Sequence, residues 1–193
     1  MGKKLSEMSL EELWQLFPIT LTTHRTYWKD WYAKEADLLQ HILPTDCVDR
    51  ISHIGSTAVA GIWAKPIIDI LVEVSEDSDF RALKDCLTAG GYLCMSENSR
   101  RMSFNKGYTE NGFAQRVFHL HLRRSGDNDE LYFRDYLIAY PDIAQKYEAL
   151  KLGLWKQYEH DRDGYTEAKT AFIKEITDKA KKEFPARWEM FAG

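Results

Sequence analysis

A Gly-Ser pair between two strand-like segments, the second of which carries a lone aspartate, restricts the fold of this chain more than any other feature. Residues 47–54 and 66–74 predict two strands joined by a turn and a short helix. Gly55 allows the backbone to turn tightly and to approach a ligand closely. Asp69 lies in an apolar run, where an ionised carboxylate is unfavourable unless a cation or hydrogen-bond donors compensate it. The pattern predicts a β-sheet with a polar site on its surface.

The turn and the aspartate together predict a site for a phosphate-bearing ligand and a divalent metal. Ser56 and Thr57 would place hydroxyls and free backbone N–H groups at the start of a helical turn, where anions are favoured. Lys65 would reach a phosphate from the edge of the loop, although a lysine in such a place is often merely solvated. Mg²⁺ is commonly held by a carboxylate, here Asp69, and by substrate phosphates. The alternative is a structural Gly-Ser turn and an aspartate that accepts backbone hydrogen bonds at a sheet edge.

Length and composition suit one domain with a helical extension. The chain has 193 residues and a hydrophobic content of 44%. We expect a single domain over residues 1–193, with a core at about 18–125 and C-terminal helices at about 129–184 packed on it. The formal net charge of −4 predicts no general attraction to nucleic acid or to anionic membranes. Small phosphorylated molecules remain as partners.

The cysteine pattern and the absence of a long apolar run predict a cytoplasmic protein. Cys47, Cys86 and Cys94 are odd in number and lack zinc-finger spacing, which argues against disulfides and structural zinc. No segment approaches the roughly 18 consecutive apolar residues of a membrane helix. The first residues lack the apolar stretch of a secretory signal.

The remaining pattern predicts an α+β fold. A capping box of Ser9 and Glu12 begins the first helix, and Pro44 ends the second. Helices are predicted over 9–17, 27–42, 79–89, 129–140, 142–158 and 165–182, and strands over 47–54, 66–74, 92–95 and 116–123. Residues 96–112 are polar and predict a hairpin or a mobile flap.

Alternation in residues 116–123 places two histidines on one face of a strand. The apolar residues of this segment alternate with His119 and His121, so the two imidazoles point the same way. That spacing suits the chelation of one transition metal, and imidazoles can also transfer protons near neutral pH. We predict that both histidines act together with Asp69, whereas His53 is equally well explained as a structural residue.

Several ordered motifs resemble the GrpB family. They are residues 53–59 (HIGSTAV), 64–70 (AKPIIDI), 118–122 (FHLHL), 133–137 (FRDYL) and 165–169 (YTEAK). The similarity spans about Pro18 to Ile176. This family is grouped by resemblance with the nucleotidyltransferase superfamily, which implies a small mixed sheet flanked by helices. Members of that superfamily have a Gly-Ser turn and three strand carboxylates, bind two Mg²⁺ ions, and transfer a nucleotidyl group from a nucleoside triphosphate to a hydroxyl or phosphate.

This chain departs from the two-metal pattern at Leu71, where the second carboxylate would lie. Side chains two residues apart on a strand share a face at roughly 6.6 Å and can share metals. Glu73 has the right parity but lies roughly 13 Å along the strand from Asp69, and we expect it to be an exposed carboxylate at the strand end. His119 and His121 stand where the third carboxylate would be, and imidazole favours Zn²⁺, Mn²⁺, Fe²⁺ or Ni²⁺ over Mg²⁺.

Two functions follow from these patterns and from the resemblance. The first is a nucleotidyltransferase-like protein that binds a nucleotide or another phosphate-bearing ligand with a divalent metal, either Mg²⁺, Mn²⁺ or a transition metal, and transfers a nucleotidyl group. In it the ligand-binding residues are Gly55, Ser56, Thr57 and Lys65, and the metal-binding and catalytic residues are Asp69, His119 and His121. The second is a catalytically silent binding or regulatory module that keeps the fold without the second carboxylate. A histidine-rich metallohydrolase is a third interpretation.

Overall fold

A five-stranded mixed sheet forms the centre of the structure, a computed structural model that describes residues 3–188. The strand order is β1-β2-β5-β4-β3, in which β2 and β5 are parallel and the other neighbours are antiparallel. The strands are β1 (Val48–Ile54), β2 (Ile68–Val74), β3 (Leu93–Glu97), β4 (Arg101–Thr109) and β5 (Gly112–Arg124). A mixed sheet flanked by helices confirms the α+β prediction. The predicted division of the chain near residue 125 stays a prediction.

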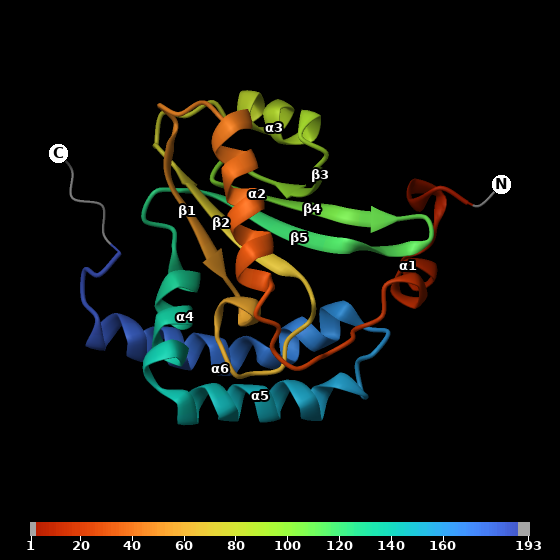
Figure 1. Ribbon diagram of the computed structural model, residues 1–193, viewed down its shortest axis with the longest axis vertical. Coiled ribbons are helices and arrows are strands. Elements are labelled where there is room, and N and C mark those ends of the chain that lie inside the picture. Colours follow the sequence, from red (N-terminus) through yellow and green to blue (C-terminus); the bar gives the residue numbers. More distant parts are fainter. Residues whose placement is uncertain (1–2, 189–193) are drawn as a thin grey trace.

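Helices lie on both faces of this sheet (Figure 1). They are α1 (Leu10–Leu16), α2 (Trp28–Ile42), α3 (Phe80–Ala89), α4 (Asp129–Ala139), α5 (Pro141–Trp155) and α6 (Arg162–Glu183), with single 3-10 turns at Leu5–Glu7 and Ser56–Ala58. The predicted capping box begins α1, since the N–H of Glu12 donates to Ser9 Oγ at 3.2 Å and the N–H of Ser9 donates to Glu12 Oε2 at 2.6 Å. Asp79 caps α3 through its side chain. Local signals of this kind explain why the predicted helices are confirmed with small differences at their ends.

One face of the sheet is apolar and packs against α2 and α3. Alternate residues of β2 and β5 point to this face and are buried, namely Ile68, Ile70, Val72, Phe118, Leu120 and Leu122. They contact a cluster that includes Trp28 and Leu39 of α2 and Leu83 and Leu87 of α3. Burial of each such side chain contributes about 1.5–3 kcal/mol. This core fixes the strand register, and with it the residues that point to the other face.

The opposite face of the same two strands carries polar residues. Asp69, Leu71 and Glu73 of β2 alternate with the core residues, and His119 and His121 of β5 do the same. This face looks toward α4, α5 and α6, which Figure 1 shows gathered on the side of the molecule away from α3. These helices form an apolar cluster with the connection between β1 and β2, which contributes Val59 and Ile62; the helical members include Phe133, Leu137, Tyr147 and Ile176. The sheet therefore has an apolar face for stability and a partly polar face under the C-terminal helices.

The polar segment 96–112 is a hairpin, and the alternative of a mobile flap is wrong. Residues of β4 pair with β3 on one side and with β5 on the other. Phe104 in the middle of β4 is fully buried in the main core. A strand that is hydrogen-bonded on both edges and anchored by a buried phenylalanine cannot close over a ligand without breaking the sheet.

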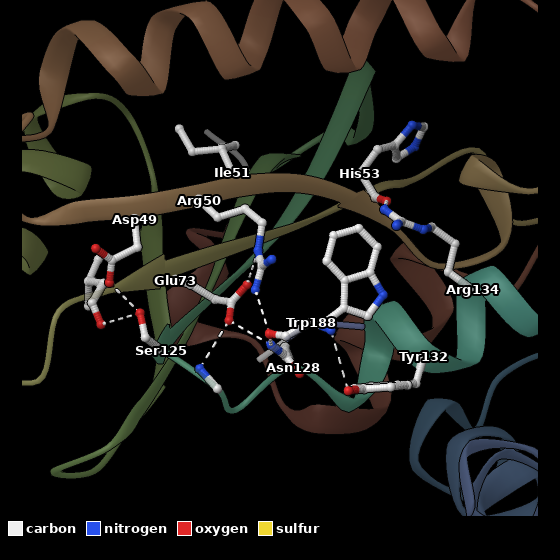
Figure 2. A network of polar contacts seen from close by, with 12 residues as sticks. Asp49, Arg50, Ile51, His53, Glu73, Ser125, Asn128, Tyr132, Arg134 and Trp188 are labelled. Atoms are coloured by element: carbon white, nitrogen blue, oxygen red, sulfur yellow. Dashed lines mark hydrogen bonds and ion pairs between the residues drawn. The ribbon is translucent and has the colours of Figure 1, made fainter. Parts of the chain in front are cut away.

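The expected exposure of Glu73 is also wrong. Its side chain is only 1% exposed and lies 2.5 Å from Arg50 Nε. Its other carboxylate oxygen accepts from the N–H of Gly126 at 3.1 Å and from Asn128 Nδ2 at 2.9 Å (Figure 2). A buried carboxylate is tolerated only when it is paired and hydrogen-bonded in this way. The strand-end position suggested exposure, but the β5–α4 connection folds back and covers it.

Trp188 extends this network at the C-terminal end of the described chain. Its carbonyl accepts from Arg50 Nη2 at 3.3 Å and from Asn128 Nδ2 at 3.0 Å, and its indole N–H donates to Asp135 at 3.1 Å. The indole, drawn in Figure 2, packs against the small apolar cluster of Ile54, Leu71 and Leu131. The segment after α6 is thereby attached to β1, β2 and α4, of which β2 carries Asp69.

Two further findings concern the chain as a whole. Among the helices within residues 3–188, none combines the length and the apolar content that a membrane-spanning segment requires. Cys47, Cys86 and Cys94 are free, in agreement with the prediction that they form no disulfides.

Candidate functional site

A cavity of about 380 Å³ lies between the polar face of the sheet and helices α5 and α6. The seven residues predicted from the sequence all line it: Gly55, Ser56, Thr57, Lys65, Asp69, His119 and His121. The helices contribute a second set that includes Tyr147, Lys151, Arg162, Tyr165 and Lys169. The structure thus brings together residues from the turn, from two strands and from two helices. Their functional roles stay predictions.

The parallel pairing of β2 and β5 explains why the aspartate and the histidines meet. Asp69 is directly opposite His119 in the register, and Leu71 is opposite His121. Since all four side chains belong to the polar face, both imidazoles lie beside the carboxylate. His119 Nδ1 is 3.4 Å and His121 Nε2 is 3.9 Å from the same oxygen, Oδ1 of Asp69.

Gly55 is required by two features of its position. Its φ angle is +69°, a conformation that residues with a side chain rarely adopt. A Cβ atom added there would lie 2.3 Å from Oδ2 of Asp69 and 3.0 Å from its Cβ. The end of β1 therefore presses directly against the aspartate, and only glycine permits that approach.

Hydrogen bonds on the far sides of the histidines determine which ring nitrogens carry protons. Arg123 Nη2 lies 3.3 Å from His121 Nδ1, and a guanidinium can only donate hydrogen bonds. Tyr108 Oη accepts a hydrogen bond from Arg162 at 2.8 Å and lies 2.8 Å from His119 Nε2, to which its hydroxyl can donate when that nitrogen carries no proton. In neutral imidazoles the protons are then on the opposite nitrogens, those that face Asp69.

These contacts keep Asp69 ionised. Burial alone raises the pKa of Asp69, but the N–H groups of His119 and His121 outweigh burial and hold the pKa well below its usual range. Burial lowers the pKa of His119, against the opposing effect of Asp69. The favoured state is an anionic carboxylate beside the imidazole of His119.

Three lysines bring positive charge into the same cavity. Lys151 is 3% exposed and Lys169 is 9% exposed, whereas Lys65 is partly buried. Burial is the main cause that lowers the pKa of Lys65 and of Lys151 to about 7 and the pKa of Lys169 to about 8. Within residues 3–188 none of the three forms an ion pair with a carboxylate, although Lys151 donates to Ser56 Oγ at 3.0 Å and to the carbonyl of Trp63.

Tyrosines form the walls between these lysines. The ammonium groups of Lys169 and Lys65 lie 4.1 Å and 5.5 Å from the ring centre of Tyr165, and Lys151 lies 4.8 Å from that of Tyr147. Tyr165 is 1% exposed, and its hydroxyl is buried without a hydrogen-bond partner among the described residues. A buried hydroxyl without a partner is unusual and indicates a place where a ligand atom or water completes the structure.

The donor set does not fit the metal centre that the sequence and the resemblance suggest. A metal-bound histidine normally donates its second N–H to an acceptor, whereas the second nitrogen of His121 faces the guanidinium of Arg123, which can only donate. Leu71, at the position of the second carboxylate, is fully buried against Ile54 and Leu131. Across residues 3–188 no three or more His, Cys, Asp or Glu side chains are grouped so that they could hold a metal ion. Metal binding at Asp69 stays a prediction, and no chemical step is derived from it.

Sequence reasoning missed Lys151 and Arg162 and left Lys169 undecided. The available signal was the position of the lysines on the buried faces of their helices. Lys151 follows Ala144 and Tyr147 at helical spacing, and all three are buried. A lysine on a buried face without a paired carboxylate is rare enough to mark a site.

His53 and the neighbouring pair Arg134 and Asp135 lie outside the cavity. His53 points to the α2 side, where it stacks on Tyr32 at 4.7 Å and hydrogen-bonds Thr57 Oγ1 at 2.9 Å. Arg134 donates to the carbonyl of His53 at 2.8 Å and forms an ion pair with Asp135. These residues support the turn from behind rather than face a ligand in the cavity.

Comparison with known proteins gives a family match over most of the chain. The family described as "GrpB protein" matches residues 18–179. The "Glutamate-rich protein GrpB" of Alkalihalophilus pseudofirmus is 36% identical over 164 residues, which are 82% of this chain and 93% of that protein.

A solved structure of a GrpB protein also matches. The crystal structure of the conserved protein GrpB from Enterococcus faecalis matches with a TM-score of 0.74 and 33% identity, and the match covers 86% of this chain and 99% of that one. Cid1 in complex with its short product ApU matches with a TM-score of 0.47 and 15% identity, over 74% of this chain and 43% of Cid1. No argument about activity rests on a likeness as low as the last.

Proposed function

The chain belongs to the GrpB family, and from this premise we propose that it binds a nucleotide or another small phosphate-bearing ligand in the cavity between the sheet and α6. The proposed ligand lies beside the Gly55-Ser56 turn, with its phosphates among the lysines. The composition of the cavity supports an anion, because four basic side chains line it against two carboxylates, those of Asp69 and the exposed Asp163, and a bound anion favours the protonated form of each lysine.

The convergence of three unpaired lysines is the observation that carries this proposal. Lysines are almost never buried unless they are paired, and the partner that Lys65, Lys151 and Lys169 lack is an anion. Phosphate oxygens accept charge-assisted hydrogen bonds from ammonium groups, each stronger than a neutral hydrogen bond. A phosphate-bearing ligand would therefore supply the missing charge.

The turn contributes less electrostatically than the sequence suggests. Its helical part, Ser56–Ala58, is a single 3-10 turn, and so few aligned peptide dipoles create little positive potential. What the turn supplies is a close approach at Gly55 and the hydroxyl of Ser56. Because that hydroxyl accepts from Lys151, its own hydrogen is directed away from the lysine and is available to a ligand.

Isothermal titration calorimetry with ATP, GTP, CTP and UTP, with Mg²⁺ or Mn²⁺ present, tests the proposal. We expect binding of at least one nucleotide, weakened about tenfold to a hundredfold by Lys169→Met because a charge-assisted hydrogen bond is lost. Lys179→Met, an exposed change on the same helix, is the matched control and should bind like the wild type. No heat from any nucleotide or from inorganic tripolyphosphate, with folded protein, would remove the proposal.

The silent binding module is the second candidate, and Leu71 favours it. A transferase needs a base for the acceptor hydroxyl and counter-charges for the leaving pyrophosphate, yet the lowered pKa of Asp69 makes its carboxylate a weak base. Introducing the missing carboxylate by Leu71→Asp is a poor test, since Leu71 is fully buried beside Ile54 and Leu131. A direct test is pyrophosphate release by the unmodified protein from each nucleotide with candidate acceptors. Steady release would exclude the silent module.

A further inference from the structure

The cavity carries fixed protein cations on the side that faces Asp69. Lys65 enters from the segment before β2, Lys151 from α5, and Arg162 and Lys169 from α6. Four positive side chains thus reach one space from three separate parts of the chain. A divalent cation in the same space would be repelled by them, and the donor set around Asp69 does not fit one.

We propose that Lys65, Lys151, Lys169 and Arg162 take the place of divalent metal ions, so that the cavity binds a polyphosphate group directly and without metal. This inference rests on the proposed function and specifies the ligand as the metal-free polyanion. The relevant chemistry is a chain of at least two phosphates, because a single phosphate cannot neutralise four cations that approach from different walls.

Two of the lysines are held in place before any ligand arrives. The ammonium of Lys151 is fixed by Ser56 Oγ and by the carbonyl of Trp63, which satisfy part of its donor capacity. The ammonium of Lys169 lies 4.1 Å from the ring centre of Tyr165. Cations that are positioned in advance need little reordering when an anion binds, and in this respect they resemble a resident metal ion.

Arg162 is positioned through a different contact. Its Nη2 donates to Tyr108 Oη at 2.8 Å, and its guanidinium lies 5.4 Å from the same ring. Only one of the five N–H groups of Arg162 is used in this contact, which leaves the remainder for phosphate oxygens. The contact with Tyr108 also ties the arginine to the histidine pair beside Asp69.

Asp69 has a different role in this arrangement from that of a metal ligand. Its Oδ1 faces both histidines, and its Oδ2 is pressed against Gly55. The carboxylate is a positioning residue whose Oδ1 lies 3.4 Å from His119 Nδ1 and 3.9 Å from His121 Nε2. Its negative charge opposes the binding of a phosphate chain, whereas a bound metal would make the same charge essential. Removal of this charge should therefore tighten phosphate binding if the site is metal-free and weaken it if a metal is required.

Calorimetry of ATP and of inorganic tripolyphosphate in EDTA, and again with excess Mg²⁺, tests the inference. We expect binding in EDTA that is at least as tight as in Mg²⁺, because Mg²⁺ neutralises the phosphate charge that the lysines contact. Asp69→Asn keeps the size of the side chain, and we expect it to tighten binding in EDTA by roughly threefold to tenfold by relieving charge repulsion. Asp85→Asn, an exposed change on α3 at the opposite face of the sheet, is the matched control and should change nothing.

Each result of this experiment has one meaning. Binding that appears only with Mg²⁺ or Mn²⁺ overturns the inference and leaves the proposed phosphate site intact. Loss of binding in Asp69→Asn that still melts like the wild type also overturns it. Absence of heat in EDTA and in Mg²⁺ alike removes the proposed function itself. The comparison of EDTA with Mg²⁺ uses the unmodified protein, so it decides the question even where the variant is unstable.

Discussion

Lys169 shows at the scale of one residue how a buried charge couples folding to ligand binding. It lies on the buried face of α6 beside Tyr165 and has no carboxylate partner within residues 3–188. Burial lowers its pKa from 10.5 to about 8, so protonation of this lysine is less favourable in the folded protein than in the unfolded chain. In the ligand-free protein the buried ammonium group of Lys169 destabilises the fold, and a bound anion would offset this effect.

The first prediction concerns the pH dependence of stability. Between about pH 8 and 10.5 the unfolded chain binds the Lys169 proton more strongly than the folded protein, so the free energy of unfolding rises with pH in this window. Lys169→Met lacks this contribution and should be more stable than the wild type at pH 7. The difference in the free energy of unfolding between the variant and the wild type should narrow by up to about 1.4 kcal/mol per pH unit above pH 8. Urea unfolding of both proteins from pH 7 to 10 measures it, and a gap independent of pH would contradict the assigned burial.

At the scale of elements, the segment after α6 is attached to β1, β2 and α4. Trp188 packs its indole against the cluster that includes Leu71, and its ring lies 4.9 Å from the guanidinium of Arg50 and 5.4 Å from that of Arg134 (Figure 2). The buried carboxylate of Glu73 organises the same network. These contacts hold the C-terminal end of α6, and with it the helix that carries Lys169.

The second prediction tests this attachment. Trp188→Ala removes ring packing on Leu71 and three cation–π contacts, and should lower the free energy of unfolding by about 2–3 kcal/mol. Trp188→Phe keeps most of the packing and loses the hydrogen bond to Asp135, so a loss of about 1 kcal/mol is expected. Urea unfolding gives both values. Equal stability of Trp188→Ala and the wild type would mean that the segment is not attached in solution.

The elements also show why sequence reasoning found one half of the site and not the other. Gly55, Ser56 and Asp69 lie within fifteen residues of chain, from 55 to 69, and their chemistry is visible in local patterns. Lys151 and Arg162 come from helices whose buried faces are predictable, but periodicity does not say which surface a helix covers. The prediction that Glu73 is exposed was wrong for the same reason, because the β5–α4 connection, which is distant in the sequence, buries this carboxylate.

At the scale of the whole molecule, the two faces of the sheet have separate tasks. The apolar face, packed on α2 and α3, fixes the register of β2 and β5. That register alone places Asp69 opposite His119 on the other face, so the alternating pattern of each strand predicts the sides correctly. The strand order, with β5 inserted between β2 and β4, follows from long-range packing that no single segment of the sequence specifies.

The central claim is that phosphate oxygens lie among the three lysines of this cavity. Crystals soaked in tungstate, a heavy analogue of phosphate, test it by anomalous scattering. We predict a tungsten peak within contact of Lys65, Lys151 and Lys169, and its disappearance in Lys169→Met crystals of the same form. Ordered tungstate at other positions, with no peak in the cavity, would contradict the claim.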